Sequence, residues 1–141
     1  MRLVIDIESN GFLEVLTTIH CIVAHDLDTG ILHTFRPHEI PAGIKLMSEA
    51  DELIAHNGIK FDVPAIQKLY PDFKPKRVID TLVCSRLIWS NIKDLDFSHF
   101  KNILPPRLFG SHSLKAWGYR LGELKGDYGQ QENAWDVYSE E

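Results

Sequence analysis

The sequence predicts one α/β domain built on a mixed sheet. Its 141 residues suffice for one hydrophobic core, and 44% hydrophobic with 25% charged residues is typical of a globular chain. Strand-like apolar runs and runs with helical spacing follow one another in the order strand, hairpin, helix, strand, helix, strand, helix. An early antiparallel hairpin followed by crossover units produces a sheet with both antiparallel and parallel neighbours.

The first part of the chain is predicted to hold most of the sheet. A polar turn, Asp-Leu-Asp-Thr-Gly, separates two apolar runs and indicates a hairpin. A later short strand runs into the turn His-Asn-Gly. The predicted elements are strands at residues 2–7, 18–25, 31–36 and 52–56 and a helix at 40–50, with Ile44, Leu46 and Met47 as core candidates.

The second part is predicted to be mainly helical. Asp80 or Thr81 is a candidate N-cap, Ser111 or Ser113 is the candidate start of the last helix, and Gly122 is its candidate end. The segment 90–110 is expected to be irregular, and the tail 123–141 is polar. The predicted elements are helices at 60–70, 82–89 and 111–122 and a short strand at 77–81.

Composition limits the classes of function. A net charge of −5 argues against a protein that coats duplex DNA through general electrostatics, but not against an enzyme that holds the end of one strand. We expect no membrane-spanning helix, because no run of about 18 apolar residues occurs. We expect no signal peptide either, and Cys21 and Cys84 are expected to be buried free thiols of a cytoplasmic protein.

Two acids stand on one face of the first predicted strand. Side chains alternate along a strand, so Asp6 and Glu8 point the same way. Like charges beside a hydrophobic core repel each other and lose hydration, and a divalent cation is the usual compensation. The alternative is that both are solvated acids at the end of a strand.

A third acid follows the turn at Asn57. Asp62 is expected at the start of a helix, near the carboxyl end of the sheet, where α/β proteins place their ligand sites. It could also simply be an acid favoured by the helix dipole. Clustered carboxylates suit Mg²⁺ or Mn²⁺, and two such ions can catalyse attack on a phosphate. The spacing therefore predicts metal-dependent phosphoryl chemistry.

These motifs resemble those of a known family. The stretch "DIESNG" resembles the Asp-x-Glu motif of DnaQ-like (DEDD) 3′→5′ exonucleases, and "HNGIKFD" resembles their second motif. The chain is also similar to the proofreading domain of the family A replicative DNA polymerases of podophages. That second resemblance is carried by "HNGIKFDVPAIQKL", "VIDTLVCSRLIWSNIKDLD" and "FGSHSLKAWGYRLGELKGDY".

The resemblance implies an RNase H-like fold with a mixed five-stranded sheet. It implies hydrolysis of phosphodiesters at a DNA 3′ end, with two Mg²⁺ or Mn²⁺ ions held by Asp6, Glu8 and Asp62. It also implies a single-stranded DNA 3′ end as partner and no membrane. The further site residues that it suggests are Asn57, Phe61, Ile7 and Ser9 for the substrate, with His56 and Asp80 as weaker candidates. Arg107, Lys115, Arg120 and Lys125 are candidates for a basic edge facing DNA.

The chain departs from the family in its last part. The third motif, Tyr-x-x-x-Asp or His-x-x-x-x-Asp on a final helix, does not occur in residues 1–141, and we expect no polymerase domain in this protein. We therefore expect a C-terminally truncated exonuclease-like domain, inactive or impaired, in the cytoplasm of a phage's bacterial host. A protein partner or dimer mate is expected to cover the edge that the missing helix leaves. The alternative is a stand-alone phage protein that binds DNA or a protein without catalysis.

Overall fold

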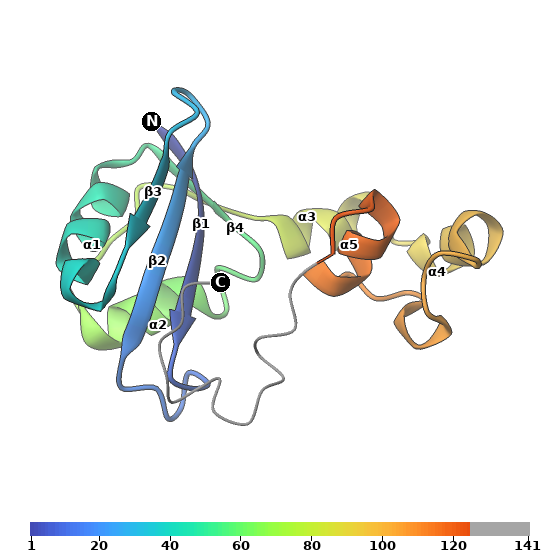
Figure 1. The fold of residues 1–141 in the computed structure, drawn as a ribbon, viewed down its shortest axis with the longest axis horizontal. Helices are drawn as coiled ribbons and strands as arrows, with labels where there is room; N and C mark the ends of the chain where they lie inside the picture. The colour runs from blue at the N-terminus through green and yellow to red at the C-terminus, as the bar shows by residue number, and fades with distance from the viewer. Residues whose placement is uncertain (125–141) are drawn as a thin grey trace.

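A computed structural model describes residues 1–124, and five strands in this part of the chain form one mixed sheet. The strand order is β3-β2-β1-β4-β5, so β1 lies at the centre (Figure 1). β1 pairs antiparallel with β2 and parallel with β4, β2 pairs antiparallel with β3, and β4 pairs parallel with β5. The strands are β1 (Arg2–Ser9), β2 (Ile19–Asp26), β3 (Leu32–Phe35), β4 (Glu52–Ala55) and β5 (Val78–Asp80). The predicted α/β class, mixed five-stranded sheet and hairpin are confirmed.

Two helices pack on one face of this sheet. α1 (Ile40–Glu49) follows a 3₁₀ turn (Pro37–Glu39), and α2 (Asp62–Leu69) follows the turn after β4. Alternation along β1 buries every second side chain of the strand against these helices. The hydrophobic core contains, among others, Leu3, Ile5, Ile7, Ile22, Leu53, Ile44, Met47, Ala65 and Ile66.

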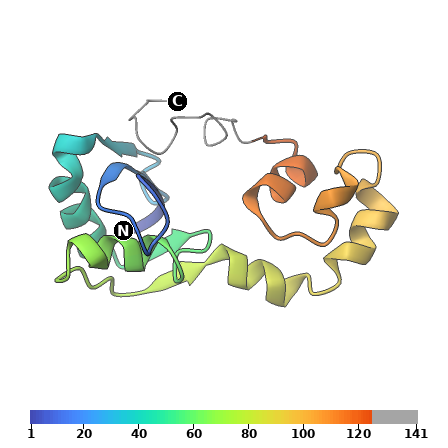
Figure 2. The same ribbon diagram turned by 90° about the horizontal axis from the view of Figure 1, so that it is seen from below.

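The remaining helices lie beside the sheet. Figures 1 and 2 show the segment from α3 to α5 extending away from α1 and α2 in both views. We call residues 1–80 the sheet body and residues 81–124 the helical lobe. The elements of the lobe are α3 (Thr81–Ile88), α4 (Ile92–Leu95), a π-helical turn (Asp96–Phe100), a 3₁₀ turn (Pro106–Leu108) and α5 (Leu114–Leu121).

The predicted caps explain where the lobe's two longer helices begin and end. Asp80 caps α3 by accepting hydrogen bonds from the N–H groups of Leu82 and Val83. Ser113 caps α5, and Gly122 ends it in the left-handed conformation with φ of 75°. Of the two alternatives for each cap, Asp80 and Ser113 are therefore confirmed.

The structure differs from the prediction in the length of β1 and in how deeply some side chains are buried. β1 continues through Glu8 to Ser9, and Cys21 and Cys84 are free thiols but only half-buried. Leu46 is also half-buried, whereas Ile44 and Met47 are buried. No helix within residues 1–124 is long and apolar enough to cross a membrane. The predicted polar tail lies, from residue 125 onward, outside the described residues.

Candidate active site

The first two predicted acids lie on the exposed face of β1. Asp6 pairs in register with Val23 of β2, and Glu8 pairs with Cys21. Both acids are exposed, so the face that carries them is open to solvent rather than pressed against the core. Alternation places Ile7 and Ser9 on the other face, where both are buried. The side chains of Ile7 and Ser9 therefore point away from the two acids.

Asp62 is the first residue of α2, and its side chain is buried. Burial and then the negative charge of Asp6 raise the pKa of Asp62 to about 7, although backbone hydrogen bonding at Asp62 itself and from Ile7 acts in the opposite direction. The repulsion means that the Asp6 and Asp62 carboxylates are close enough to interact. The structure thus brings one acid of the first motif together with the acid of the second.

The repulsion between these two carboxylates favours binding of a cation. A divalent ion between Asp6 and Asp62 would replace repulsion with attraction and would compensate for the burial of Asp62. Within residues 1–124, however, no group of three or more His, Cys, Asp or Glu side chains is arranged to hold a metal ion. The chemistry of the donors fits Mg²⁺ or Mn²⁺, while the geometry gathers two of the predicted carboxylates rather than three.

The loop between β4 and α2 has a constrained backbone. Asn57 has φ of 68°, a left-handed conformation that asparagine tolerates better than most residues. At the next residue, Gly58, an added Cβ would lie 2.5 Å from the Cβ of Ala55, so only glycine fits there. Phe61 is half-buried and packs against the core. Asn57 is also half-buried, and much of the Phe61 ring supports the core.

Asp80 ties this loop to the helical lobe. Its carboxylate accepts hydrogen bonds from the N–H groups of Asn57 (2.9 Å) and Ile59 (3.1 Å), in addition to those at the start of α3. Burial alone would raise the pKa of Asp80, but these four N–H donors outweigh it and hold the pKa below its ordinary value. Nearby, His56 Nδ1 lies 2.9 Å from Thr81 Oγ1.

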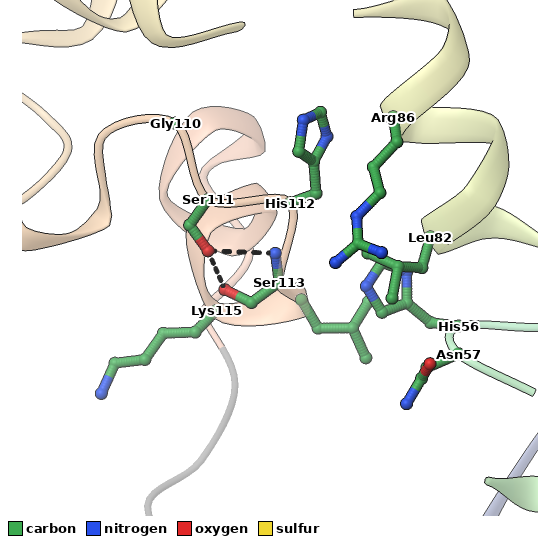
Figure 3. Close-up of a pocket in the computed structure, with 10 residues that line it drawn as sticks. His56, Asn57, Leu82, Arg86, Gly110, Ser111, His112, Ser113 and Lys115 are labelled. Carbon is green, nitrogen blue, oxygen red and sulfur yellow. Dashed lines mark hydrogen bonds between the residues drawn. The ribbon is translucent and has the colours of Figure 1, made fainter. Parts of the chain in front are cut away.

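A pocket of about 620 Å³ opens between the sheet body and the helical lobe (Figure 3). His56 and Asn57 reach it from the β4–α2 loop, and Arg86 reaches it from α3. The start of α5 forms the opposite wall (Figure 3). The described residues that line it are His56, Asn57, Leu82, Arg86, Gly110, Ser111, His112, Ser113, Leu114 and Lys115.

The pocket suits an anion. Among its described lining residues none is Asp or Glu, whereas Arg86 and Lys115 are cationic. The N-terminal end of α5, where helix dipoles favour negative charge, also faces it. Burial lowers the pKa of both His56 and His112, so these imidazoles are neutral near pH 7 and offer hydrogen bonds instead of charge.

Sequence reasoning missed most of this pocket. Lys115 was a candidate for a basic edge, but nothing in the sequence singled out Arg86, and Ser111 was considered only as a possible helix start. The proximity of these residues depends on how the lobe meets the sheet body. The prediction for Arg120 was wrong: it is 8% exposed and forms an ion pair with Asp96 inside the lobe. Arg107 does not line the pocket, and Lys125 lies outside the described residues.

Comparison with known proteins relates the chain to phage polymerases. No protein-family model matches it. A DNA-directed DNA polymerase of Enterobacteria phage T3 is 45% identical over 138 residues, which cover 89% of this chain and 20% of the polymerase. The DNA-directed DNA polymerase of Escherichia phage T7 is 44% identical over 138 residues, with the same shares covered. The chain is therefore homologous to one segment of these phage DNA polymerases, and it spans about a fifth of their length.

Proposed function

We propose that this chain is a 3′→5′ exonuclease domain with an RNase H-like fold, which acts on the 3′ ends of single-stranded DNA. The observation that carries the proposal is the carboxylate pair at the centre of the sheet. Asp6 stands on the exposed face of β1, and the pKa of Asp62 is raised to about 7, first by its burial and then by the negative charge of Asp6. The mixed sheet and the homology to phage DNA polymerases support the same conclusion.

Asp6, Glu8 and Asp62 are the residues that would hold Mg²⁺ or Mn²⁺. When bound, such an ion supplies an activated water and stabilises negative charge that develops on a phosphate. The chain's own contribution is to hold the buried carboxylate of Asp62, at the start of α2, near the exposed carboxylate of Asp6 on β1.

The pocket and one exposed loop supply the contacts for DNA. Arg86 and Lys115 would bind phosphates, and Asn57 and His56 would contact the nucleotides nearest the 3′ end. Phe12, in the loop after β1, is 68% exposed and would stack on an unpaired base. Lys68 of α2 supports this loop by donating to the carbonyl oxygens of Leu13 and Glu14 at 2.9 and 3.0 Å.

The decisive experiment compares the chain with an Asp6→Asn variant. Mn²⁺ should raise the melting temperature of the unchanged chain, because an ion that binds only the native state stabilises it by about 2.7 kcal/mol at a free concentration of 100 Kd. Asp6→Asn should remove most of that rise. In line with the expected impairment, an oligonucleotide labelled at its 5′ end should be shortened only slowly from the 3′ end with Mn²⁺, and Asp6→Asn should abolish this shortening.

Asp28→Asn is the matched control, because it removes the same charge from a surface ion pair with Arg2 at the β2–β3 turn. This variant should keep both the metal-dependent rise and the shortening. A melting temperature that Mn²⁺ leaves unchanged in the unmodified chain would count against the metal site. Shortening that survives Asp6→Asn would remove Asp6 from the chemistry.

A second candidate function is DNA binding without hydrolysis, and the basic pocket favours it because its lining residues exclude Asp6, Glu8 and Asp62. Replacing Arg86 or Lys115 with glutamine should weaken binding of a single-stranded oligonucleotide. Each replacement should also reduce the slope of log K against log salt by about 0.7. Fluorescence anisotropy over a salt series measures both effects. Pure binding predicts the same affinity with and without Mn²⁺, whereas the exonuclease proposal predicts tighter binding with the ion.

A further inference from the structure

The Asp80 carboxylate joins the two elements that form one side of the pocket. Oδ1 accepts from the N–H groups of Asn57 and Leu82, each at 2.9 Å, and from Val83 at 3.4 Å. Oδ2 accepts from the N–H of Ile59 at 3.1 Å. Asn57 belongs to the β4–α2 loop, and Leu82 belongs to α3. One buried side chain thus holds both elements at a fixed separation.

The same contacts reach the start of α2. The carbonyl oxygen of Asn57, whose N–H is bound to Asp80, accepts from the N–H groups of Lys60 (3.2 Å) and Phe61 (2.9 Å). The next carbonyl, that of Gly58, accepts from the N–H of Val63 at 2.9 Å. These bonds set the first turn of α2, which carries Asp62. A series of hydrogen bonds therefore runs from Asp80 through the loop to Phe61 and Val63, the two neighbours of Asp62.

We propose that Asp80 is a positioning residue that fixes the pocket wall and the start of α2 for DNA binding, and not a metal ligand. This inference rests on the proposed function. A carboxylate offers about four lone-pair directions, and of the four backbone N–H groups bound to Asp80 three share Oδ1 and one reaches Oδ2, which leaves only one direction, at Oδ2, for a further ligand. Its side chain is 4% exposed, so it is also closed off from solvent.

A positioning role and a purely electrostatic role of Asp80 predict opposite changes in DNA affinity when its charge is removed. Removal of a negative charge near a phosphate-binding pocket should tighten DNA binding if charge alone matters. Loss of positioning should weaken it. Asp80→Asn separates the two, because its amide oxygen can still cap α3 and bind Asn57, while its amide nitrogen would face the N–H of Ile59.

The test measures binding of a fluorescent single-stranded oligonucleotide with a phosphorothioate 3′ linkage, in Mg²⁺, by anisotropy. Asp80→Asn should weaken binding about tenfold, which is the lower end of the effects seen at metal sites when a hydrogen-bond partner behind a ligand is removed. Asp80→Glu keeps the charge but displaces the oxygens, so it should weaken binding as well. Asp28→Asn removes the same charge at the β2–β3 turn and should leave binding unchanged. Thermal denaturation establishes that each variant is folded.

Unchanged or tighter binding by folded Asp80→Asn would overturn the inference, as would wild-type affinity in Asp80→Glu. If the unmodified chain binds no oligonucleotide, the proposed function fails, and amide hydrogen exchange then decides the positioning role separately. Faster exchange at Lys60, Phe61 and Val63 in Asp80→Asn, with β1 unchanged, supports it. Exchange unchanged at those three amides refutes it.

Discussion

Asp62→Asn should make the metal-free protein more stable at pH 8, by a few kcal/mol and at most about 4 kcal/mol. The buried carboxylate must be ionised at that pH beside Asp6, which is unfavourable in the native state and harmless in the unfolded chain. An asparagine oxygen can still accept a hydrogen bond from the backbone but carries no charge. Urea denaturation of both proteins at pH 8 in EDTA measures the difference.

The stability gained by Asp62→Asn should increase as pH rises. The pKa of Asp62 is about 7 in the folded protein, whereas its ordinary value is 3.8. Between these two pH values the native state holds a proton that the unfolded state has released, so the free energy of unfolding falls as pH rises. The advantage of Asp62→Asn should therefore be absent near pH 4, grow towards pH 7 and level off above it.

Two comparisons make this prediction specific. Asp72→Asn removes a charge from an exposed position and should leave the pH dependence of the unmodified protein in place. Saturating Mn²⁺ should stabilise the unmodified protein, because the ion binds the Asp62 carboxylate in the native state. It should not stabilise Asp62→Asn, which lacks this carboxylate. A stability difference between the two proteins that stays constant from pH 4 to 8 would show that ionisation of Asp62 does not destabilise the native state.

Much of the fold was predictable because its signals are local. Alternation identified the strands, and short polar residues marked the starts of α3 and α5, at Asp80 and Ser113. β1 continues to Ser9 because its alternating buried residues, including Ile7 and Ser9, still pack against the core while Asp6 and Glu8 face solvent. The prediction ended this strand at Ile7, before the polar turn, whereas the alternation of buried and exposed side chains continues to Ser9.

The candidate site was predictable only in the parts that short sequence motifs contain. The sequence motifs selected Asp6, Glu8 and Asp62 as candidates, but they did not predict the burial of Asp62 or its interaction with Asp6, since these depend on how α2 packs. The pocket was not predicted, because Arg86 and the start of α5 are brought near His56 only by the placement of the helical lobe. Asp80 was recognised as a cap. Its bonds to Asn57 and Ile59 were not predictable, because they join the end of β5 to the loop after β4, which is more than 20 residues earlier in the sequence.

Arg120→Met should destabilise the helical lobe by about 3–5 kcal/mol, the usual cost of leaving a buried charge without its partner. Arg120 Nε and Nη2 each donate to Asp96 at 2.8 Å, and both side chains are at most 1% exposed. Arg120 Nη2 also donates to the Ser111 carbonyl oxygen at 2.7 Å, and its guanidinium lies 4.9 Å from the centre of the Trp117 ring. Methionine keeps much of the packing but provides none of these hydrogen bonds.

The double variant Arg120→Met/Asp96→Leu should recover much of this loss, because a buried pair replaced by apolar side chains of similar size is often neutral in stability. Arg2→Met, which breaks an exposed pair with Asp28, should cost less than about 1 kcal/mol. Chemical denaturation of all four proteins gives the comparison. A loss as large in the double variant as in Arg120→Met would mean that packing, rather than the unpaired charge, is responsible.

The pH dependence of Arg120→Met tests the same cause independently. Burial alone would raise the pKa of Asp96, but the hydrogen bonds from Arg120 and from the N–H of Gly110 hold it below its ordinary value. Without Arg120 the folded-state pKa should rise above that of the unfolded chain, so the variant's deficit should grow as pH increases and shrink in acid. Since Arg120 also binds Ser111 at the pocket wall, oligonucleotide affinity should fall together with the stability of the lobe.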